Sequence, residues 1–467
     1  MTGTIDVAVI GAGPAGMAAA VEAVSHGLSV VVLDEQPEPG GQIYRNISTN
    51  AASPSRINKI LGPDYQKGAV LAQQFLSACE AGRIDYRRDA TVWQVDDDLT
   101  IHLSQGGRAA DLHSRRIIVA TGAMERPVPI PGWTLPGVLG AGAAQIMLKS
   151  ACAVPDGPVV IAGCGPLLLL VAQQLVDAGA RVSALLETTR FSDYLAALPA
   201  LPGALRSHAM LRKGMAMRRR INEAGVSIHA GVTALEAVGG DRVKAVRFMR
   251  SGVIGEIPAS TLLLHQGVVP NTQLTWQLGC EHVWDDGQRC WRPALDDWGN
   301  TSIDGVVVAG DGGGIGGAEA AAVAGRIAGL DAAHRLGKLG GDERDTATAP
   351  LRRDLAMHLA IRPLLDALFK PSREILTPPK AETIVCRCEE VTAGAIRDAV
   401  ALGATGPNQM KSYLRCGMGP CQGRFCGLTV AEIIAAERGI SMEETGYYRI
   451  RPPIKPVTLG ELAGLDD

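Results

Sequence analysis

Residues 5–34 read IDVAVIGAGPAGMAAAVEAVSHGLSVVVLD, and this stretch decides the fold. An apolar run from Asp6 to Ile10 predicts a buried strand, and a Gly-rich turn follows at 11–16. The Ala-rich run from Met17 to His26 then predicts a helix, and the β-branched run from Leu28 to Leu33 predicts a second strand. Together they form a strand, helix and strand unit of the dinucleotide-binding type.

The glycines of this turn have separate roles in such a unit. Gly11 allows the tight turn, Gly13 lets a pyrophosphate approach the backbone, and Gly16 lets the helix pack on the sheet. The helix N-terminus then faces the phosphates. A carboxylate at the end of the second strand binds a ribose hydroxyl, and Asp34 is the first candidate, with Glu35 beside it as the second. The predicted binding residues of the turn itself are Gly11, Gly13, Pro14, Ala15 and Gly16.

The same pattern occurs a second time in the chain. A strand at 158–162 leads into Gly163 and Gly165, a helix through Asp177, and a further strand at 181–186. A third strand, within 305–311, runs into an Ala-rich helix and is expected to return to the first unit. The sequence therefore predicts an α/β fold with two Rossmann-like domains, the second inserted in the first.

The second glycine motif departs from the dinucleotide fingerprint. Leu168 stands where the third glycine is expected, although Glu187 occupies the position of a ribose-binding carboxylate. Gly163, Gly165 and Glu187 are thus the candidate residues of a second nucleotide site. Three hypotheses remain: NAD(H) as a substrate, a static nucleotide such as ATP or NAD, and a domain kept for packing alone.

Further motifs resemble the FAD elements of flavoproteins with two dinucleotide-binding domains. They are Pro-Gly-Gly-Gln at 39–42, Ala-Thr-Gly at 120–122, and Gly310-Asp311 before the Ala-rich helix. The resemblance implies FAD in the first unit, with the additional contacts Gly41, Gln42, Ala120, Thr121, Gly122, Gly310, Asp311 and Ala320. The middle domain contains no Cys-x-x-Cys, which excludes a flavin-linked dithiol and hence disulfide reduction.

Composition excludes other classes of protein. The 467 residues carry a formal net charge of -3, so no strong basic field is present to bind nucleic acid. The apolar runs are too short for a membrane-spanning helix, and the N-terminal sequence reads as a strand and not as an export signal. We expect a cytoplasmic location, with peripheral contact to the inner membrane left open.

Cysteines gather near the C-terminus. Of the ten in the chain, five lie between Cys386 and Cys426, which favours metal ligation over disulfides in a reducing compartment. Four thiolates suit either zinc or an iron–sulfur cluster. The C-x-C motif with a distant cysteine pair resembles the bacterioferritin-associated ferredoxin-like [2Fe-2S] domain, which implies Cys386, Cys388, Cys421 and Cys426 as ligands. Cys416 is then spare, although a competing set uses Cys416 and Cys421 and leaves Cys426 spare.

These features divide the chain into five expected segments. The FAD-binding domain takes 1–150 and 265–335, and the second nucleotide-binding-like domain takes 151–264. A polar linker with a helix near Leu351 to Phe369 covers 336–380. The [2Fe-2S] domain covers 381–440, and a Pro-bearing strap covers 441–467.

The order of all these motifs resembles one family over nearly the whole chain: the FAD-containing subunits of multi-subunit amino-acid dehydrogenases and oxidases. This family includes the A-subunit of opine oxidase, the α subunit of D-hydroxyproline or proline dehydrogenase, and the flavoprotein subunit of hydrogen cyanide synthase. The resemblance implies that a glycine-oxidase-like FAD subunit oxidises a C–N bond of an amino acid, imino acid or opine. Electrons then reach the cluster and FAD of this chain, and finally a quinone or other acceptor.

Several points stay open at this stage. A third, small subunit is compatible with the resemblance, and so is an FMN at a subunit interface. No residue of this chain is predicted to act as a catalytic base. Two other hypotheses are a self-sufficient NAD(P)H-dependent oxidoreductase of the ferredoxin-reductase type and a non-catalytic assembly scaffold.

Overall fold

The first sheet is built around the N-terminal unit. The computed structural model describes residues 4–52 and 56–465. β1 (Ile5–Ile10) lies in the sheet with β2 (Val30–Leu33) and β3 (Ile84–Arg87) parallel on one side and β6 (Arg108–Val119) parallel on the other. β19 (Val306–Val308) pairs in parallel with the end of β6, whereas β5 (Thr100–Gln105) and β4 (Ala90–Val95) continue from its beginning in antiparallel fashion. The strand near residue 306 therefore returns to the first unit, as the sequence predicts.

Two helices pack closely on this sheet because small residues face each other. A Cβ at Gly325 in α11 (Ala318–Arg335) would lie 2.1 Å from the carbonyl oxygen of Ala15 in α1 (Pro14–Ser25). A Cβ at Gly329 would lie 2.8 Å from the carbonyl oxygen of Ala19. This close approach brings the N-termini of α1 and α11 to the same edge of the sheet. Three further helices cover the unit: α2 (Ile47–Ala52), α3 (Arg56–Leu61) and α4 (Pro63–Glu80).

The second sheet is wholly parallel. Its order is β11 (Ser227–Ala230), β10 (Val182–Glu187), β9 (Val159–Cys164), β15 (Thr261–Gln266) and β8 (Val138–Gly140). Its helices are α5 (Ala141–Ala151), α6 (Pro166–Ala178) and α9 (His208–Glu223), and an antiparallel sheet of β12 (Val232–Gly239), β13 (Val243–Arg250) and β14 (Val253–Pro258) lies beside it. β8 is an edge strand of this sheet although it precedes the expected boundary at residue 151.

A short ribbon connects the two units. β7 (Ala123–Glu125) leaves the first unit, β16 (Val268–Pro270) returns to it, and the two strands pair antiparallel. The chain then forms α10 (Gln273–Gln277) and the hairpin of β17 (His282–Asp285) and β18 (Cys290–Pro293). Short helices complete the described units: α7 (Phe191–Ala197), η1 (Leu198–Ala200), α8 (Leu201–Ala204), η2 (Leu205–Ser207) and η3 (Gly310–Gly313).

The linker is more helical than the sequence predicts. The prediction of a single helix near Leu351 to Phe369 is wrong, because α12 spans Gly341–Leu359 and α13 spans Arg362–Leu368. A further short helix, α14, spans Arg373–Leu376. The Glu343 carboxylate accepts from the Gly340 amide at 3.2 Å and so satisfies one free N–H group at the start of α12. Pro350 lies within this helix despite its missing N–H group.

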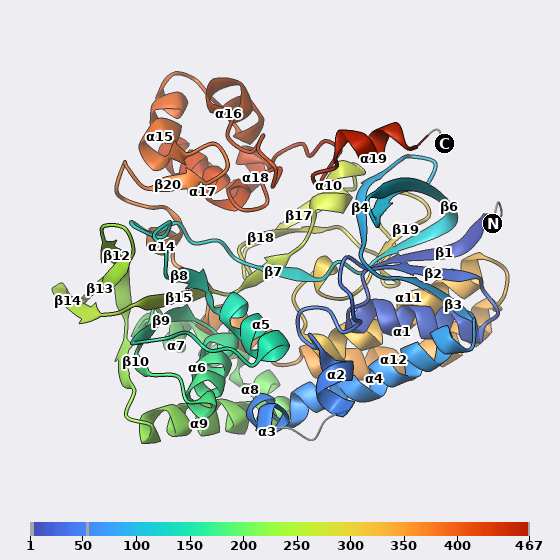
Figure 1. Ribbon diagram of the computed structural model, residues 1–467, viewed down its shortest axis with the longest axis horizontal. Helices are drawn as coiled ribbons and strands as arrows, with labels where there is room; N and C mark the ends of the chain where they lie inside the picture. The colour runs from blue at the N-terminus through green and yellow to red at the C-terminus, as the bar shows by residue number, and fades with distance from the viewer. Residues whose placement is uncertain (1–3, 53–55, 466–467) are drawn as a thin grey trace.

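The C-terminal domain is a small helical unit that contains the cysteines. It comprises β20 (Ile384–Cys386), β21 (Val391–Thr392), α15 (Ala393–Ala401), α16 (Pro407–Leu414), α17 (Gly427–Arg438) and α18 (Met442–Thr445). In Figure 1 it lies at the upper left, above the second Rossmann-like unit. The strap then crosses to the first unit, where the Ile454 amide donates to the Trp93 carbonyl at 2.8 Å before α19 (Leu459–Ala463). The strap's last two positions, 466 and 467, lie outside the described residues.

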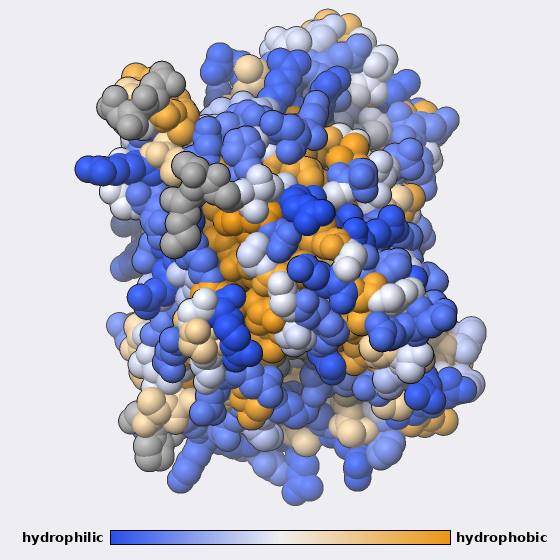
Figure 2. All heavy atoms as spheres, turned by 90° about the vertical axis from the view of Figure 1, so that its right-hand side faces the viewer, coloured by the Kyte–Doolittle hydropathy of each residue, from blue (hydrophilic) through white to orange (hydrophobic). Residues whose placement is uncertain are grey.

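The surface of the first unit mixes polar and apolar side chains. Figure 2 shows apolar side chains gathered in the middle of one face, with hydrophilic side chains around them. Within residues 4–52 and 56–465, none of the helices has both the length and the apolar character that a membrane span requires.

Candidate cofactor sites

The three glycines of the first turn are required for different reasons. A Cβ at Gly11 (φ +106°) would lie 2.6 Å from the Ala120 carbonyl oxygen, and one at Gly16 would lie 1.8 Å from the Gly11 carbonyl oxygen. Both positions require glycine because a side chain there would clash with a backbone carbonyl of the same chain. At Gly13 the nearest atom is the Gly41 Cα, 3.9 Å away, so the protein itself leaves room for a side chain. The absence of one fits a site where a phosphate group approaches the backbone.

The start of α1 offers unsatisfied donors at the same place. Gly13 is the N-cap residue, and no side chain caps the helix there. The first N–H groups of a helix have no partner within the helix and bear a partial positive charge. This end of α1 can therefore bind an anion such as a pyrophosphate.

The two candidate ribose carboxylates differ in their surroundings. Asp34 accepts from the backbone amides of Ala12 and Gln36, the latter at 2.7 Å, and burial raises its pKa above the usual value. Its carboxylate thus holds the end of β2 against the glycine turn. Glu35 points outward and pairs with Lys455 of the C-terminal strap at 2.5 Å. The strap therefore reaches the edge of the site where a ribose is expected.

The loop that contains Gly41 and Gln42 is held by a lysine that the sequence did not reveal. The Gly40 amide donates to the Ala12 carbonyl at 2.8 Å, which places this loop against the first turn. Lys149 of α5 is 2% exposed, and its Nζ donates to the carbonyls of Gln42 at 3.1 Å and Ile43 at 2.9 Å. Burial is the main cause that lowers the pKa of Lys149 to about 7.

The remaining predicted FAD contacts lie at the same sheet edge. Ala120 and Gly122 follow β6 directly, and the Ala120 amide donates to the Ile10 carbonyl at 2.9 Å. Asp311 accepts from the amides of Gly316 and Gly317, each at 2.9 Å, and so shapes the loop before α11. Gly317 caps α11 without a side-chain bond, which leaves a second free helix N-terminus beside Ala320.

The second glycine motif keeps the backbone geometry of a nucleotide site. A Cβ at Gly163 (φ +142°) would lie 1.6 Å from the His265 carbonyl oxygen, so glycine is required by packing. Leu168 is 1% exposed and belongs to the core between α6 and the sheet. The leucine thus fills the place where a third glycine would let helix and strand approach more closely.

Other groups of the chain already occupy this second motif. Glu187 is engaged by Arg218 of α9 at 2.6 Å. The thiol of Cys164, which lies between the two glycines, donates to the Phe369 carbonyl of the linker at 3.4 Å. An ion pair between Arg190 and Glu374 at 3.0 Å holds the next linker segment nearby. These contacts favour a packing role for the second domain.

The C-terminal cysteines converge in space. The Sγ atoms of Cys386, Cys416 and Cys426 lie within 4.8 Å of one another, and all three residues are buried. Thiol donors from Cys416 and Cys426 lower the pKa of Cys386 to about 2, which favours its thiolate form. The structure thus brings together two of the predicted ligands and the cysteine that was expected to be spare.

The other two predicted ligands form a neighbouring pair. Cys388 is exposed and interacts with Cys421. A Cβ at Gly419 would lie 2.3 Å from the Cys388 Cβ, and one at Gly417 would lie 2.6 Å from the Tyr448 ring. The glycines of this loop therefore allow close packing around the thiols.

Two contacts that sequence reasoning missed attach the C-terminal domain to the first unit, one at α17 and one at the loop 415–426 that contains Cys416, Cys421 and Cys426, called the thiol loop below. Arg289, in the turn between β17 and β18, bonds Glu432 of α17 at 2.5 and 2.6 Å, and their side chains are only 11% and 3% exposed. Gln273 of α10 donates to the Gln422 carbonyl at 2.9 Å. Glu432 stands in the mainly apolar stretch 428–435, which is the sequence signal for a buried polar contact, but this signal does not name the partner.

Comparison with known families agrees with this arrangement. The chain matches the family Pyridine nucleotide-disulphide oxidoreductase over residues 5–326 and the Sarcosine oxidase A3 domain over residues 380–465. It therefore belongs to the pyridine nucleotide-disulphide oxidoreductases and, within them, to the flavoprotein subunits of multi-subunit oxidases and dehydrogenases. The expectation of an FAD-dependent oxidoreductase is confirmed.

Individual relatives cover the chain almost completely. The A-subunit of opine oxidase from Rhizobium meliloti is 47% identical over 468 residues, which cover 98% of this chain and 87% of that protein. Hydrogen cyanide synthase subunit HcnB of Pseudomonas aeruginosa is 34% identical, with 98% of both chains covered. The crystal structure of L-proline dehydrogenase from P. horikoshii shares the fold with a TM-score of 0.72 at 19% identity, covering 98% of this chain and 79% of that chain.

Proposed function

We propose that this chain is the FAD and iron–sulfur electron-transfer subunit of an enzyme whose partner subunit oxidises a C–N bond. The substrate class is an amino acid, imino acid or opine. Similarity to the A-subunit of opine oxidase and to hydrogen cyanide synthase subunit HcnB supports this class. The partner that the resemblance implies is a glycine-oxidase-like flavoprotein, and the final acceptor is a quinone or another oxidant.

One observation carries the proposal: the thiol loop is attached to the flavin-binding edge of the first unit. The Asn271 amide donates to the Gly122 carbonyl at 2.9 Å, and Gln273, two residues on, donates to the Gln422 carbonyl at 2.9 Å. A metal centre with a purely structural role has no need of this neighbourhood. A one-electron centre must lie near the flavin, because the two exchange electrons.

FAD supplies two-electron chemistry that can be divided into single electrons, and an iron–sulfur cluster accepts them one at a time. The residues of this chain bind and position those groups. Gly13 and the free end of α1, beside the Gly41 loop, would hold the pyrophosphate, and Asp311 fixes the turn that places α11. The positive end of α11 favours negative charge on a reduced flavin ring.

The donor set fits a [2Fe-2S] cluster, which needs two thiolates for each iron. We infer that Cys386 and Cys426 form one pair and that Cys388 and Cys421 form the other. Cys416 then lies against the first pair without ligating. Four thiolates also suit zinc, but zinc would not exchange electrons with a flavin.

The second domain has a structural role in this account. The pairing of Glu187 with Arg218 removes the carboxylate that would bind a ribose hydroxyl. The alternative, an NAD(P)H-dependent oxidoreductase, requires this carboxylate to be free. It also requires access to the glycine turn, where Cys164 bonds the Phe369 carbonyl of the linker. A static nucleotide in this domain, or an FMN at a subunit interface, is not needed for electron flow through this chain.

A reduction experiment separates these functions. The chain is purified with its co-expressed partner, and flavin absorbance is followed without oxygen after addition of either NADH or an amino-acid or opine substrate. The proposal predicts rapid bleaching by the substrate of the complex and little by NADH. Rapid, saturable bleaching by micromolar NADH in the isolated chain would select the reductase, and inertness to both reductants would select the scaffold.

A further inference from the structure

Gln273 lies where the first unit meets the thiol loop. It begins α10, with two residues between it and the end of the connecting strand β16, and the residue is 5% exposed. Its amide Nε2 lies 2.9 Å from the Gln422 carbonyl oxygen and 3.5 Å from the Cys421 carbonyl oxygen. The side chain therefore contacts the two consecutive peptide groups that follow Cys421.

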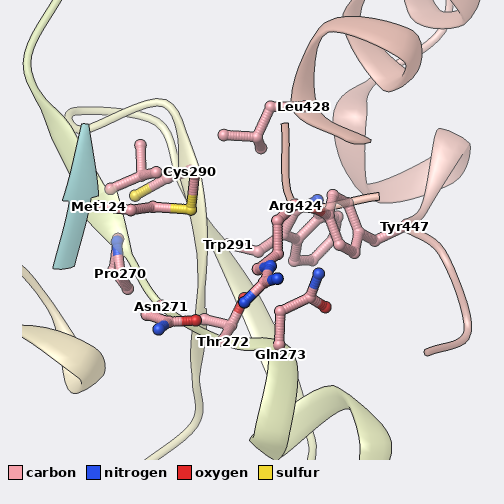
Figure 3. A pocket seen from close by; sticks show the side chains of 11 residues that line it. Met124, Pro270, Asn271, Thr272, Gln273, Cys290, Trp291, Arg424, Leu428 and Tyr447 are labelled. Atoms are coloured by element: carbon pink, nitrogen blue, oxygen red, sulfur yellow. The ribbon is translucent and has the colours of Figure 1, made fainter. Parts of the chain in front are cut away.

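The chemistry of these neighbours fixes the orientation of the amide. Both are carbonyl oxygens, which only accept hydrogen bonds, so the NH₂ group must face them. The Oε1 atom then points away, and it has no partner among the described residues. It lines a cavity of about 20 Å³ together with Trp291, whose buried Nε1 is also unpaired in the described part of the chain (Figure 3). That volume holds roughly one water.

The other side of this contact belongs to the flavin-binding segment. Asn271 donates its amide to the Gly122 carbonyl at 2.9 Å and accepts from the Thr121 hydroxyl at 3.2 Å. Three consecutive residues, 271–273, therefore connect the segment 120–122 with the loop that contains Cys421. Figure 3 shows Asn271, Thr272 and Gln273 between the connecting strand and the C-terminal domain.

We propose that Gln273 is a positioning residue for the metal centre, holding the Cys421 loop at the flavin edge and raising the reduction potential of the cluster. This inference rests on the proposed function. A partial positive charge close to an iron–sulfur cluster stabilises its more negative, reduced state, and the Gln273 NH₂ group places one beside the Cys421 backbone. Its removal favours the oxidised state.

The test replaces Gln273 by Met, which has a similar length and no polar atoms, and by Leu as a second variant. Gln277→Leu is the matched control. Gln277 lies on the same helix, but its amide bonds the Val95 backbone at 2.8 and 3.1 Å instead of the thiol loop. Iron, acid-labile sulfide and the cluster's reduction potential are measured on the full chain, the potential by an EPR-monitored redox titration.

The expected result is a negative shift of the potential in both Gln273 variants and none in the control. The equilibrium between oxidised and reduced cluster should change by about threefold to tenfold, where tenfold corresponds to about 59 mV for one electron. Loss of iron from both Gln273 variants with full retention of FAD would also support the positioning role. An unchanged potential with full iron and sulfide would overturn it, whereas a wild-type chain without iron and sulfide would overturn the proposed function instead.

Discussion

The Nζ atom of Lys149 lies 3.1 Å from the carbonyl oxygen of Gln42, so a lysine of the second unit holds the loop beside the proposed flavin site of the first. The same Nζ donates to Ile43 and to the Gln145 side chain at 2.9 Å, and these three acceptors match the three protons of its ammonium form. The two units are thus joined by a side chain that touches the cofactor loop directly.

Lys149→Met should weaken FAD binding. Each buried carbonyl that loses its donor costs about 1 to 3 kcal/mol, and the loop becomes free to move. We expect FAD to dissociate at least about tenfold more readily, which corresponds to about 1.4 kcal/mol. Flavin fluorescence after dilution measures the release. Lys59→Met, on the exposed face of α3, is the control, and equal FAD retention in both variants would contradict the role of Lys149.

The pH dependence of stability gives an independent check of this lysine. Because its pKa in the folded chain is about 7, the unfolded chain binds a proton that the folded one does not at higher pH. Stability from Lys149 therefore rises with pH from about 7 towards the unfolded value near 10.4 and is lost as pH falls. The Tm of the wild type minus the Tm of Lys149→Met should increase between pH 7 and 9.5. A constant or shrinking difference would show that Lys149 keeps an ordinary pKa.

The glycine turn allows a test that separates binding from folding. Gly13 has φ −76° and ψ −176°, which valine adopts without strain, and the nearest atom to an added Cβ is 3.9 Å away. Gly13→Val should therefore fold and lose FAD. Gly16→Val should not fold stably, since its Cβ would lie 1.8 Å from the Gly11 carbonyl oxygen. A folded Gly13→Val protein with full flavin absorbance would show that the FAD pyrophosphate does not bind at this turn.

The five thiols give a sharp prediction because two ligand sets are possible. Cys416→Ser should keep iron, acid-labile sulfide and the visible cluster spectrum, whereas Cys421→Ser and Cys426→Ser should each lose them. The proximity of Cys416 to Cys386 and Cys426, within 4.8 Å, makes this test necessary. Cluster loss in Cys416→Ser with retention in Cys426→Ser would show that the competing set is the correct one.

The ion pair between Arg289 and Glu432 should hold the C-terminal domain in place. Glu432→Ala leaves Arg289 buried without its carboxylate, which costs about 3 to 5 kcal/mol. Differential scanning calorimetry should show a lower Tm for this variant, and limited proteolysis should cleave the linker faster. Glu437→Ala on the same helix removes a more exposed pair with Arg397 and should cost about 0 to 1 kcal/mol. Similar losses in both variants would argue against a special role for Glu432.

The sequence predicts the local parts of this molecule well. The roles of Gly11, Gly16 and Gly163 could be predicted because a strand, a tight turn and a helix follow each other within a few residues. The linker was harder: the polar residues near Glu343 suggested a loop, yet they form the first turns of α12, since Glu343 bonds the Gly340 amide at the helix start.

Contacts between distant segments could not be predicted. Lys149 with Ile43, Gln273 with Gln422 and Arg289 with Glu432 each join residues more than a hundred positions apart. Nothing in the local pattern of either residue names its partner, because the contact arises only when the two units and the C-terminal domain pack together. The role of Cys416 belongs to the same class, since spacing along the chain does not determine which thiols meet.

We propose above that electrons from a partner's C–N oxidation reach an iron–sulfur centre in this chain. EPR spectroscopy of the anaerobic complex, frozen after addition of an amino-acid or opine substrate, tests it most directly. We expect the signal of a reduced [2Fe-2S] cluster in the wild-type complex and its absence in Cys421→Ser. Zinc without sulfide in the wild type, or a cluster that stays oxidised while the flavins are fully reduced, would contradict it.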